Sequence, residues 1–371
     1  MTRLSPIDAS ADRLARLQRT LCRQGLSAYL ATGHIEVSYL SNFGGDDSWL
    51  FVPARGSAVL LTDFRFAEDA AADCPHLPAR LRKGSLADEL KSLASRLRRP
   101  LAYNPDDVTV TQRRLLGLCV RAGGLKPLPD AVRRMRLIKD ANEVGALRRA
   151  LRVAEEAYVE FLTRIRVGMT ERHLAAELDY CMRRYGSDGP GFPTICAIGP
   201  NASKPHHRPG NRRLDRTSLL LIDFGASVDG YTSDLTRMVF LTKIRPDVRR
   251  AYQAVLDAQL AAIAAAGPGV RAFDVDAAAR AVLGQHRLAD AFGHGTGHGL
   301  GRQVHEAPTL SPRAGRTVLE PGMVVTVEPG VYLPGRFGIR IEDDVLITAT
   351  GAEVLSRLPK GADEVILDGI G

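Results

Sequence analysis

The amino-acid sequence predicts an α/β protein (α+β in overall arrangement) with a smaller N-terminal domain and a larger C-terminal domain made of two related halves. The chain has 371 residues, which suits two domains of ordinary size, and 45% of them are hydrophobic, enough for a core in each. Helical and extended patterns alternate in the first third, as they do in α/β domains. Further on, a helix–glycine turn–helix pattern occurs twice, about 100 residues apart, which indicates two copies of one unit.

The first 130 residues carry the pattern of the N-terminal domain. Leu14, Leu17 and Leu21 recur at helical spacing, and Gly25 follows as a C-terminal cap. Short apolar runs predict strands at 27–32, 49–53 and 58–62, and longer runs predict helices at 65–73, 86–97 and 111–120. Residues 125–140, which contain several Pro and Arg residues, have the composition of a linker. We therefore expect an N-terminal α/β domain at 1–130, a linker at 131–141 and a C-terminal domain at 142–371.

Two pairs of helices are expected in the C-terminal domain. Asp140 and Glu143 fit a capping box that opens a helix over 142–164, and Thr170 caps a second helix that ends before Gly186. In the second half, Pro246 fits the first turn of a helix that reaches residue 266, and a glycine turn leads into another helix. A glycine-rich extended segment follows each pair, at 189–199 and at 293–301. We expect the two halves to be related by a pseudo-twofold axis.

The strongest chemical signal is a predicted hairpin at residues 218–240. Asp229-Gly230 is a typical two-residue hairpin turn between two apolar runs. The register that follows from this turn places Asp223 opposite Thr236, with Asp234 diagonal to Asp223 on the same face. Diagonal neighbours in a sheet lie about 7–8 Å apart, close enough for two carboxylates to share a pair of metal ions. The alternative is a pair of carboxylates that point into water, which the apolar flanking residues disfavour.

A second signal is a cluster of histidines among glycines at residues 293–308. Gly stands at every second position from 293 to 301, so His294 and His298 cannot belong to a helical zinc motif. In an extended segment His294, Thr296 and His298 project to one face, while the glycines let another backbone approach the opposite face. His305 follows in the same kind of segment. A single histidine is usually structural, but three within twelve positions predict a functional site.

Further carboxylates follow apolar strands near the C-terminus. Glu328 ends one such run, and Arg340 and Glu342 lie two positions apart in another, so both face the same side. A buried ion pair would explain each fragment alone. Together with the hairpin and His298, however, the chain offers four oxygen ligands and one nitrogen, which suit Mn²⁺, Co²⁺ or Zn²⁺. A carboxylate-rich pair of such ions is suited to the hydrolysis of a carbonyl compound.

Composition argues against several other functions. The net charge is +8, and residues 1–140 contribute +7 of it (22 basic and 15 acidic residues) through scattered arginines, with no nucleic-acid-binding motif. The five cysteines form no CxxC pair, so we expect reduced thiols. The N-terminus lacks the apolar segment of a signal peptide, and no apolar run is long enough to cross a membrane. We expect a cytoplasmic protein with neither nucleic acid nor a membrane as partner.

Four motifs in order, LIDFG-x₆-TSDLTR, HGTGHGLG-x₃-HE, TVEPGVY and GIRIED, resemble those of the pita-bread metallopeptidases. The aminopeptidase P and prolidase branch is the most similar, and the stretch GPNASKPHHRPGNRRL before the first motif resembles its substrate-binding segment. The resemblance covers residues 140–371, and residues 1–130 resemble the creatinase-like N-terminal domain of the same proteins. One departure is Arg302-Gln303, where many relatives have a small or apolar residue and then an acidic one, which leaves the subsite preference open.

The resemblance implies a role for each site residue. Asp223 would bind one metal ion, Asp234 and Glu342 would bridge both ions, and His298 with Glu328 would bind the other. Glu328 would also take the proton of the attacking water. Five further residues have an implied catalytic role. His206 would contact the substrate or leaving group, and His294 and His305 would contact the scissile carbonyl and the proline. Arg340 and Tyr332 would lie beside the bridging carboxylates. His207, next to His206, is the less secure member of that pair.

The activity implied by the resemblance is hydrolysis of the Xaa-Pro bond at peptide N-termini by a hydroxide held between two divalent ions, most simply Mn²⁺. We expect an Xaa-Pro aminopeptidase that acts on proline-containing peptides, with an Xaa-Pro dipeptidase (prolidase) as the alternative, and the choice between them depends on contacts of the N-terminal domain and of the dimer that the sequence does not specify. A binding module or a repurposed non-peptidase hydrolase on the same fold would be expected to lack some of the five ligands. Relatives also imply a homodimer or a higher homo-oligomer.

Overall fold

The computed structural model describes residues 6–120 and 124–367, and the ends of the predicted domains at 1–5 and 368–371 lie outside this range. Two compact units make up the chain, Met1–Arg136 and Leu137–Gly371. In the described ranges no helix is both long and apolar enough to cross a lipid bilayer. All five cysteines are free thiols.

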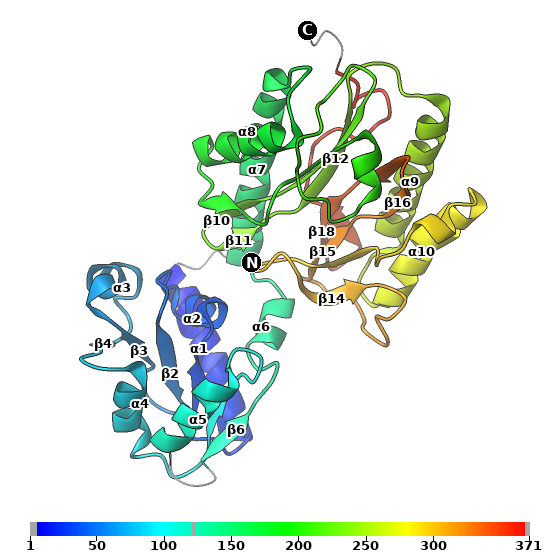
Figure 1. The fold of residues 1–371 in the computed structure, drawn as a ribbon. Helices are drawn as coiled ribbons and strands as arrows, with labels where there is room; N and C mark the ends of the chain where they lie inside the picture. The colour runs from blue at the N-terminus through cyan, green and yellow to red at the C-terminus, as the bar shows by residue number, and fades with distance from the viewer. Residues whose placement is uncertain (1–5, 121–123, 368–371) are drawn as a thin grey trace. The chain divides into compact units, whose positions relative to one another are not determined.

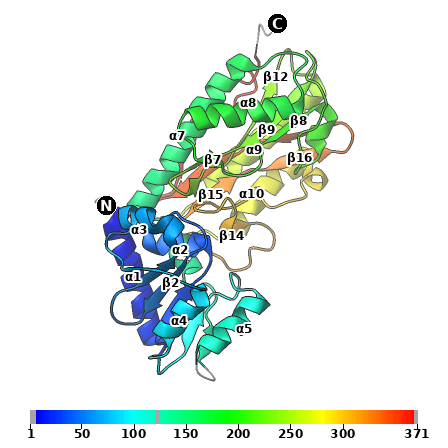
Figure 2. The ribbon, with the colours of Figure 1, turned by 60° about the vertical axis from the view of Figure 1, so that its left-hand side comes forward.

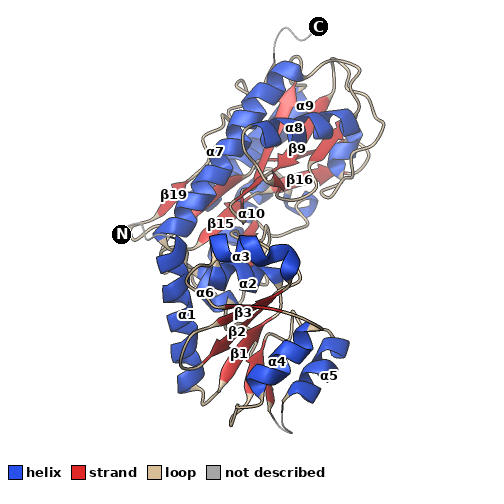
Figure 3. Ribbon diagram, turned by 90° about the vertical axis from the view of Figure 1, so that its left-hand side faces the viewer, coloured by secondary structure: helices blue, strands red, loops and turns tan. Residues whose placement is uncertain are grey.

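The N-terminal unit is a sheet of six strands in the order β4-β3-β2-β1-β5-β6 with helices on both faces. Its strands are β1 Ala28–Ala31, β2 Trp49–Pro53, β3 Val59–Thr62, β4 Ala79–Leu81, β5 Leu101–Tyr103 and β6 Leu125–Pro127. Its helices are α1 Pro6–Arg23, α2 His34–Ser41, α3 Ala67–Asp73, α4 Leu86–Ala94, α5 Val110–Cys119 and α6 Arg133–Leu137. Figures 2 and 3 show α1 on one side of β1–β3 and α4 with α5 on the other. Each side has its own apolar cluster.

Several elements of this unit differ from the sequence prediction, among them the short strands β4 and β5, which were not expected. Helix α2 was not expected, because six of its eight residues are buried and no helical hydrophobic period remains to be detected. The predicted linker-like stretch at 125–140 is not all linker, since Leu125–Pro127 pairs in parallel with β5 as an edge strand and Arg133–Leu137 is helical. A strand of three residues is too short to show a period of two.

The C-terminal unit places its strands between two pairs of helices (Figure 1). The helices are α7 Ala141–Arg164, α8 Glu171–Arg184, α9 Pro246–Ala265 and α10 Ala272–Gln285. A three-stranded sheet contains β8 Ile195–Ile198, β9 Leu219–Phe224 and β12 Leu235–Phe240, in the order β12-β9-β8. A five-stranded sheet contains β13 Gly297–Gly299, β14 Glu306–Leu310, β15 Val324–Val327, β18 Asp343–Ile347 and β19 Ala352–Val354, in the order β14-β13-β15-β18-β19. The smaller sheets contain β7 Gly189–Pro190, β10 Ala226–Val228, β11 Tyr231–Thr232, β16 Gly330–Leu333 and β17 Phe337–Arg340.

Alternate residues of these strands face the two helix pairs. In β9, Leu220 and Ile222 pack in the cluster of α7 and α8, whereas Leu219 and Leu221 pack in the cluster of α9 and α10. Strands β15 and β18 divide in the same way. Both faces of the central strands are therefore buried, which explains why the sequence shows continuous apolar runs before Asp223 and Glu328.

The predicted helix starts and the hairpin register are confirmed. Asp140 and Glu143 form a reciprocal capping box, and the Thr170 hydroxyl caps α8 by accepting from the His173 amide. Thr236 pairs with Asp223 and Val228 with Tyr231, as expected from the Asp229-Gly230 turn. The hairpin is nevertheless interrupted, and its distal part, β10 and β11, joins β7 in a separate sheet.

Candidate metal centre and active site

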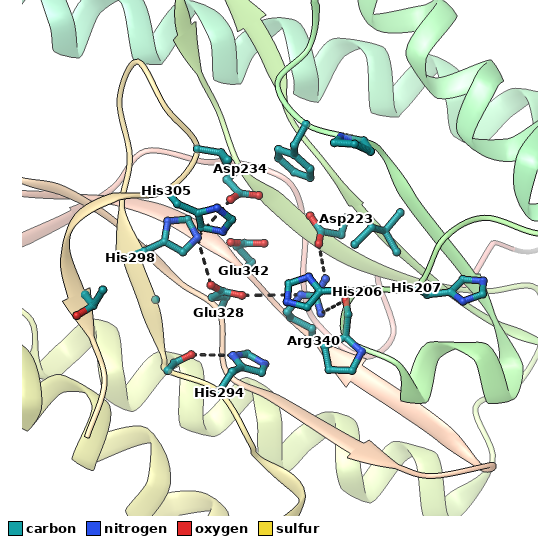
Figure 4. Close-up of a pocket in the computed structure, with 18 of the residues that line it drawn as sticks. His206, His207, Asp223, Asp234, His294, His298, His305, Glu328, Arg340 and Glu342 are labelled. Atoms are coloured by element: carbon teal, nitrogen blue, oxygen red, sulfur yellow. Dashed lines mark hydrogen bonds and ion pairs between the residues drawn. The ribbon is translucent and has the colours of Figure 1, made fainter. Parts of the chain in front are cut away.

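A cavity of about 550 Å³ lies in the C-terminal unit, and nearly every site residue expected from the sequence lines it (Figure 4). The expected residues that line it are His206, His207, Asp223, Asp234, His294, His298, His305, Glu328, Arg340 and Glu342. Tyr332 is not among the lining residues, but its hydroxyl bonds to two of them, His294 and Arg340, at 2.8 Å each.

The two aspartates are placed by the interruption of the hairpin. A Cβ atom at Gly225 would lie 1.8 Å from the carbonyl oxygen of Ser233, so only glycine permits the two strands to approach so closely. Asp223 lies in β9 just before this point, and Asp234 lies in the break between β11 and β12. The backbone amide of Asp234 donates to Asp344 at 3.3 Å, which ties the break to β18.

The second half supplies the other ligand candidates from three separate segments. His298 lies in β13, where a Cβ at Gly297 would lie 1.9 Å from the Thr326 oxygen and a Cβ at Gly299 would lie 2.1 Å from the Ala307 oxygen. These glycines therefore let the neighbouring strands approach, as the sequence pattern predicts. Glu328 follows β15 directly, and Glu342 stands between β17 and β18.

Ligand atoms of Asp234, His298 and Glu342 lie within 4.8 Å of one another, a spacing that can hold a metal ion. The His298 Nε2 atom also lies 3.4 Å from Glu328 Oε1 and 3.6 Å from Asp234 Oδ2. Asp223 accepts from Arg340, and its other oxygen, Oδ1, is buried without a hydrogen-bond partner in the described structure.

Burial and mutual repulsion dominate the electrostatics of this cluster. Burial raises the pKa of Asp234 well above its usual value. The negative charges of Glu342 and Asp223 are the next largest causes of this increase. Burial and the neighbouring carboxylates raise the pKa of Glu342 in the same way. For Glu328, burial raises the pKa to about 8 against the opposing effect of Arg340. Burial also lowers the pKa of His298 to about 4, so its ring is neutral and can act as a ligand.

This donor set fits divalent metal ions. Three buried carboxylates, Asp223, Asp234 and Glu342, lie with the partly buried Glu328 around the buried guanidinium of Arg340, and Asp223 has one oxygen without a hydrogen-bond partner among the described residues. Buried carboxylates are stable only when paired or when they coordinate metal. One nitrogen and four oxygen donors, with no thiolate, suit hard or borderline divalent ions.

Arg340 and Thr236 lie next to the carboxylates and orient them through hydrogen bonds. The Arg340 guanidinium donates to Asp223, to the Thr236 hydroxyl at 3.0 Å and to the Tyr332 hydroxyl at 2.8 Å. The Thr236 hydroxyl in turn donates to Glu342 at 2.6 Å. The sequence placed Thr236 opposite Asp223 but indicated no function for it, because its bond to Glu342 joins residues 106 positions apart.

The histidines of the cavity differ in their surroundings. The ring of His294 bonds to Gly295 O at 2.7 Å and to the Tyr332 hydroxyl at 2.8 Å, and burial lowers its pKa to about 4. His305 stacks edge-on against His298, with ring centroids 4.4 Å apart. His206 is exposed at the cavity, whereas the neighbouring His207 points the other way (Figure 4).

One side chain, that of Thr296, does not lie where the sequence pattern suggested. Thr296 does not share the pocket face with His294 and His298, because the chain becomes a regular strand only at Gly297 and the Thr296 hydroxyl bonds to Asp276 of α10 at 2.9 Å. Arg302 lies over the Tyr231 ring, with its guanidinium carbon 4.9 Å from the ring centroid. Arg302 does not line the cavity, so its difference from relatives does not alter a subsite directly.

Comparison with known proteins agrees with this architecture. The sequence profile of metallopeptidase family M24 matches residues 145–349, and that of the creatinase/prolidase N-terminal domain matches residues 13–138. A peptidase of Bacillus subtilis is 35% identical over 94% of this chain and 98% of its own length. The solved structure of an Xaa-Pro dipeptidase from Bacillus anthracis superposes with a TM-score of 0.90, at 31% identity over 97% of this chain and 99% of that one.

The structure of an X-Pro aminopeptidase from Thermotoga maritima has a TM-score of 0.88, at 32% identity over 95% of this chain and all (100%) of that one. The predicted fold, a creatinase-like N-terminal domain followed by a pita-bread catalytic domain, is confirmed by these matches, and so is the prediction of a metallopeptidase. Members of such a family act with divalent metal ions, in keeping with the donor cluster described above. The chain belongs to metallopeptidase family M24.

Proposed function

We propose that this protein hydrolyses the Xaa-Pro bond at the N-terminus of peptides, with two divalent metal ions as cofactor. The observation that carries this proposal is the cluster of four carboxylates, three of them buried, and one neutral histidine, which lines a cavity. The names of two similar solved structures, an Xaa-Pro dipeptidase and an X-Pro aminopeptidase, support the choice of bond.

The metal ions would be held by the residues that form this cluster. Asp223 would bind one ion, Asp234 and Glu342 would lie between the two, and His298 with Glu328 would bind the other. When bound, the ions supply an acidified water as nucleophile and positive charge for the oxyanion that develops at the carbonyl. We propose Mn²⁺ as the physiological ion, because oxygen ligands outnumber nitrogen four to one.

The surrounding side chains would move the protons and orient the peptide. Glu328 lines the cavity beside His298, so its carboxylate would take the proton of the attacking water and pass it to the leaving nitrogen. His294 is neutral and held at both ring nitrogens, by the Gly295 carbonyl and the Tyr332 hydroxyl, so it would exchange one of these bonds to donate to the scissile carbonyl. His206 and His305 would contact the substrate from the rest of the rim.

Proline selectivity has a physical basis in the apolar wall of the cavity. Phe192, Pro193, Ile195 and Val304 line the same cavity as the histidines. These side chains can pack against a pyrrolidine ring. They offer no acceptor for an amide hydrogen, and none is needed because the nitrogen of an Xaa-Pro bond carries no hydrogen.

One observation favours dipeptides over longer peptides. Arg208 lines the cavity and is exposed, and within the described residues no hydrogen bond or ion pair engages its guanidinium. A free guanidinium beside a proline subsite would attract the free carboxylate of an Xaa-Pro dipeptide. We therefore propose an Xaa-Pro dipeptidase as the more specific function, with the Xaa-Pro aminopeptidase as the second candidate.

The test is a comparison of kcat/KM on Gly-Pro, the amide Gly-Pro-NH₂ and a Gly-Pro-Xaa tripeptide, with Mn²⁺, Co²⁺ or Zn²⁺ added to metal-free enzyme. A dipeptidase prefers Gly-Pro to its amide, and Arg208→Ala removes this preference while Arg208→Lys keeps part of it. An aminopeptidase cleaves the tripeptide at least as well as Gly-Pro. Full activity after exhaustive chelation would contradict the metallopeptidase function itself.

A further inference from the structure

The segment from Ile198 to Gly210 brings His206 and Arg208 to the cavity, and one buried carboxylate holds this segment along its length. Glu171, the first residue of α8, is completely buried. Its Oε1 atom accepts hydrogen bonds from the Ile198 amide at 2.8 Å and from the Asn201 side chain at 2.9 Å. Its Oε2 atom accepts from the Gly210 amide at 2.8 Å and lies 2.8 Å from His207 Nε2. All four partners belong to the one segment.

His207 is therefore occupied with Glu171 and does not face the reaction. Its side chain is only 9% exposed, and Figure 4 shows its ring directed away from that of His206. His206 is a central residue of a turn that the His207 amide closes by donating to the Lys204 carbonyl at 3.1 Å, so fixing the His207 ring also holds the turn that directs His206. On the other flank, the Pro205 carbonyl accepts from Arg340 at 3.4 Å, which ties the residue before His206 to the carboxylate cluster.

The contacts of Glu171 explain why a carboxylate can stand at a fully buried position. Burial raises the pKa of Glu171, but the hydrogen bonds from His207, Ile198, Asn201 and Gly210 outweigh it, and the pKa lies below its usual range. Its place at the N-terminus of α8 also suits a negative charge. Glutamine has the same shape, but its amide nitrogen cannot accept, so two of the four donors would lose their acceptor.

We propose that Glu171, acting through His207 and the backbone of residues 198–210, is a positioning residue that sets His206 against the substrate. This inference rests on the proposed function, in which His206 contacts the peptide. Glu171 itself touches neither the substrate nor the metal ligands. A residue that only stabilised the fold would affect every catalytic side chain alike, whereas Glu171 holds only the segment that carries His206 and Arg208.

The test is a double-mutant cycle in kcat/KM on the Xaa-Pro substrate that the wild type cleaves best, carried out in Arg208→Ala enzyme so that His206 is the one substrate-contacting group left on the held segment. Glu171→Gln alone lowers kcat/KM by about 10- to 100-fold, mainly through kcat. In the His206→Ala background the same change costs less than about threefold, because the group that it positions is gone. In the His294→Ala background it keeps its full effect. Equal losses in all three backgrounds would overturn the proposal.

Two further variants separate positioning from folding. Glu177→Gln, on the same helix and paired with Arg164 at 2.5 Å, is the matched control and leaves kcat/KM unchanged. If Glu171→Gln does not fold, His207→Gln removes one of the four contacts and produces a smaller loss that is again absent in the His206→Ala background. A His207→Gln loss that persists there would contradict the mechanism.

A measurement without turnover distinguishes this proposal from the proposed function. In the zinc-loaded enzyme labelled with ¹⁵N-histidine, Glu171→Gln shifts or broadens the ring resonances of His206 and leaves those of His294 unchanged. An unchanged His206 resonance would refute the positioning role even if Xaa-Pro peptides are cleaved. Conversely, a shifted resonance in an enzyme that cleaves no Xaa-Pro peptide would refute only the proposed function.

Discussion

The two halves of the C-terminal unit each pack two helices against strands, but they hold their cavity segments by different polar contacts. In the first half, Glu171 of α8 accepts four hydrogen bonds from one segment. In the second half, Asp276 of α10 bonds to the Thr296 amide and hydroxyl and pairs with Arg280 at 2.7 Å. Arg280 also donates to the carbonyl oxygens of Phe292 and His294.

The halves differ equally in how they supply ligands. The first half offers Asp223 and Asp234 from one hairpin, so their relation follows from a local turn and a strand register. The second half offers His298, Glu328 and Glu342 from three segments that meet only in the folded unit. One half thus places its ligands by local geometry, and the other places them by packing. The following changes test this difference.

The largest effect is expected from Asp234→Asn in the first half. Loss of a carboxylate from the shared set lowers metal content and costs several kcal/mol of transition-state stabilisation, about 1000-fold or more in kcat/KM. In the metal-free protein the same variant raises the melting temperature, because one of the buried carboxylates that repel one another is gone. The control is Asp229→Asn in the exposed turn of the same hairpin, which leaves metal content and kcat/KM unchanged. An Asp234→Asn variant with wild-type activity would contradict the assignment.

Metal affinity is expected to depend on pH through the second-half ligands. Burial raises the pKa of Glu328 to about 8 in the metal-free site, so metal binding must displace its proton below that pH. The affinity for Mn²⁺ therefore rises at least about tenfold per pH unit between pH 6 and pH 8. His298, with its pKa lowered to about 4, is already neutral and adds nothing to this slope.

The same raised pKa fixes the sign of the stability change. The contribution of Glu328 to the stability of the metal-free protein is present below the ordinary glutamate pKa and is lost as the pH rises through about 8. Chelator competition at pH 6, 7 and 8 measures the affinity, and thermal unfolding of the metal-free protein measures the stability. An affinity independent of pH would show that these carboxylates bind no proton in the free site.

A smaller loss is expected from Asp276→Asn, which weakens the anchor of the second half. The substitution removes the charge that pairs with Arg280 and keeps an oxygen for Thr296, so we expect a drop of about tenfold in kcat/KM. The drop is additive with His206→Ala, because the two changes act on different halves. Asp274→Asn, in the exposed first turn of α10, is the control and has no effect. Non-additivity with His206→Ala would mean that the two anchors are coupled.

The smallest effects concern the two hairpin turns. Gly230 and Gly335 both have positive φ, 73° and 72°, so alanine costs about 1 kcal/mol of unfolding free energy at each. The loss is greater at Gly230, because a Cβ there lies 2.9 Å from the Arg302 guanidinium, whereas Gly335 has no neighbour within 4 Å. Urea denaturation of the two variants gives the difference, and equal losses would show that Arg302 moves aside freely.

Several features that no local pattern encodes were missed or misplaced in the sequence prediction. Helix α2 is buried on nearly all sides, so no hydrophobic period marks it. Thr296 was expected on the face of the histidines but bonds to Asp276, twenty residues away in the chain. The bond between Thr236 and Glu342 likewise depends on two strands that meet only after folding.

The sequence by itself determined the helices with polar caps, the register of the 218–240 hairpin and the residue types of the donor cluster. These features depend on interactions between residues that are close in the sequence. Examples are a capping side chain, a two-residue turn and the alternation of side chains along a strand. Only the tertiary structure decided that His298 and Glu342 lie beside Asp234 and that the His207 ring bonds to Glu171. These contacts join segments that the burial of two apolar clusters brings together. Because the hydrophobic effect is not directional, sequence spacing alone does not specify which segments meet.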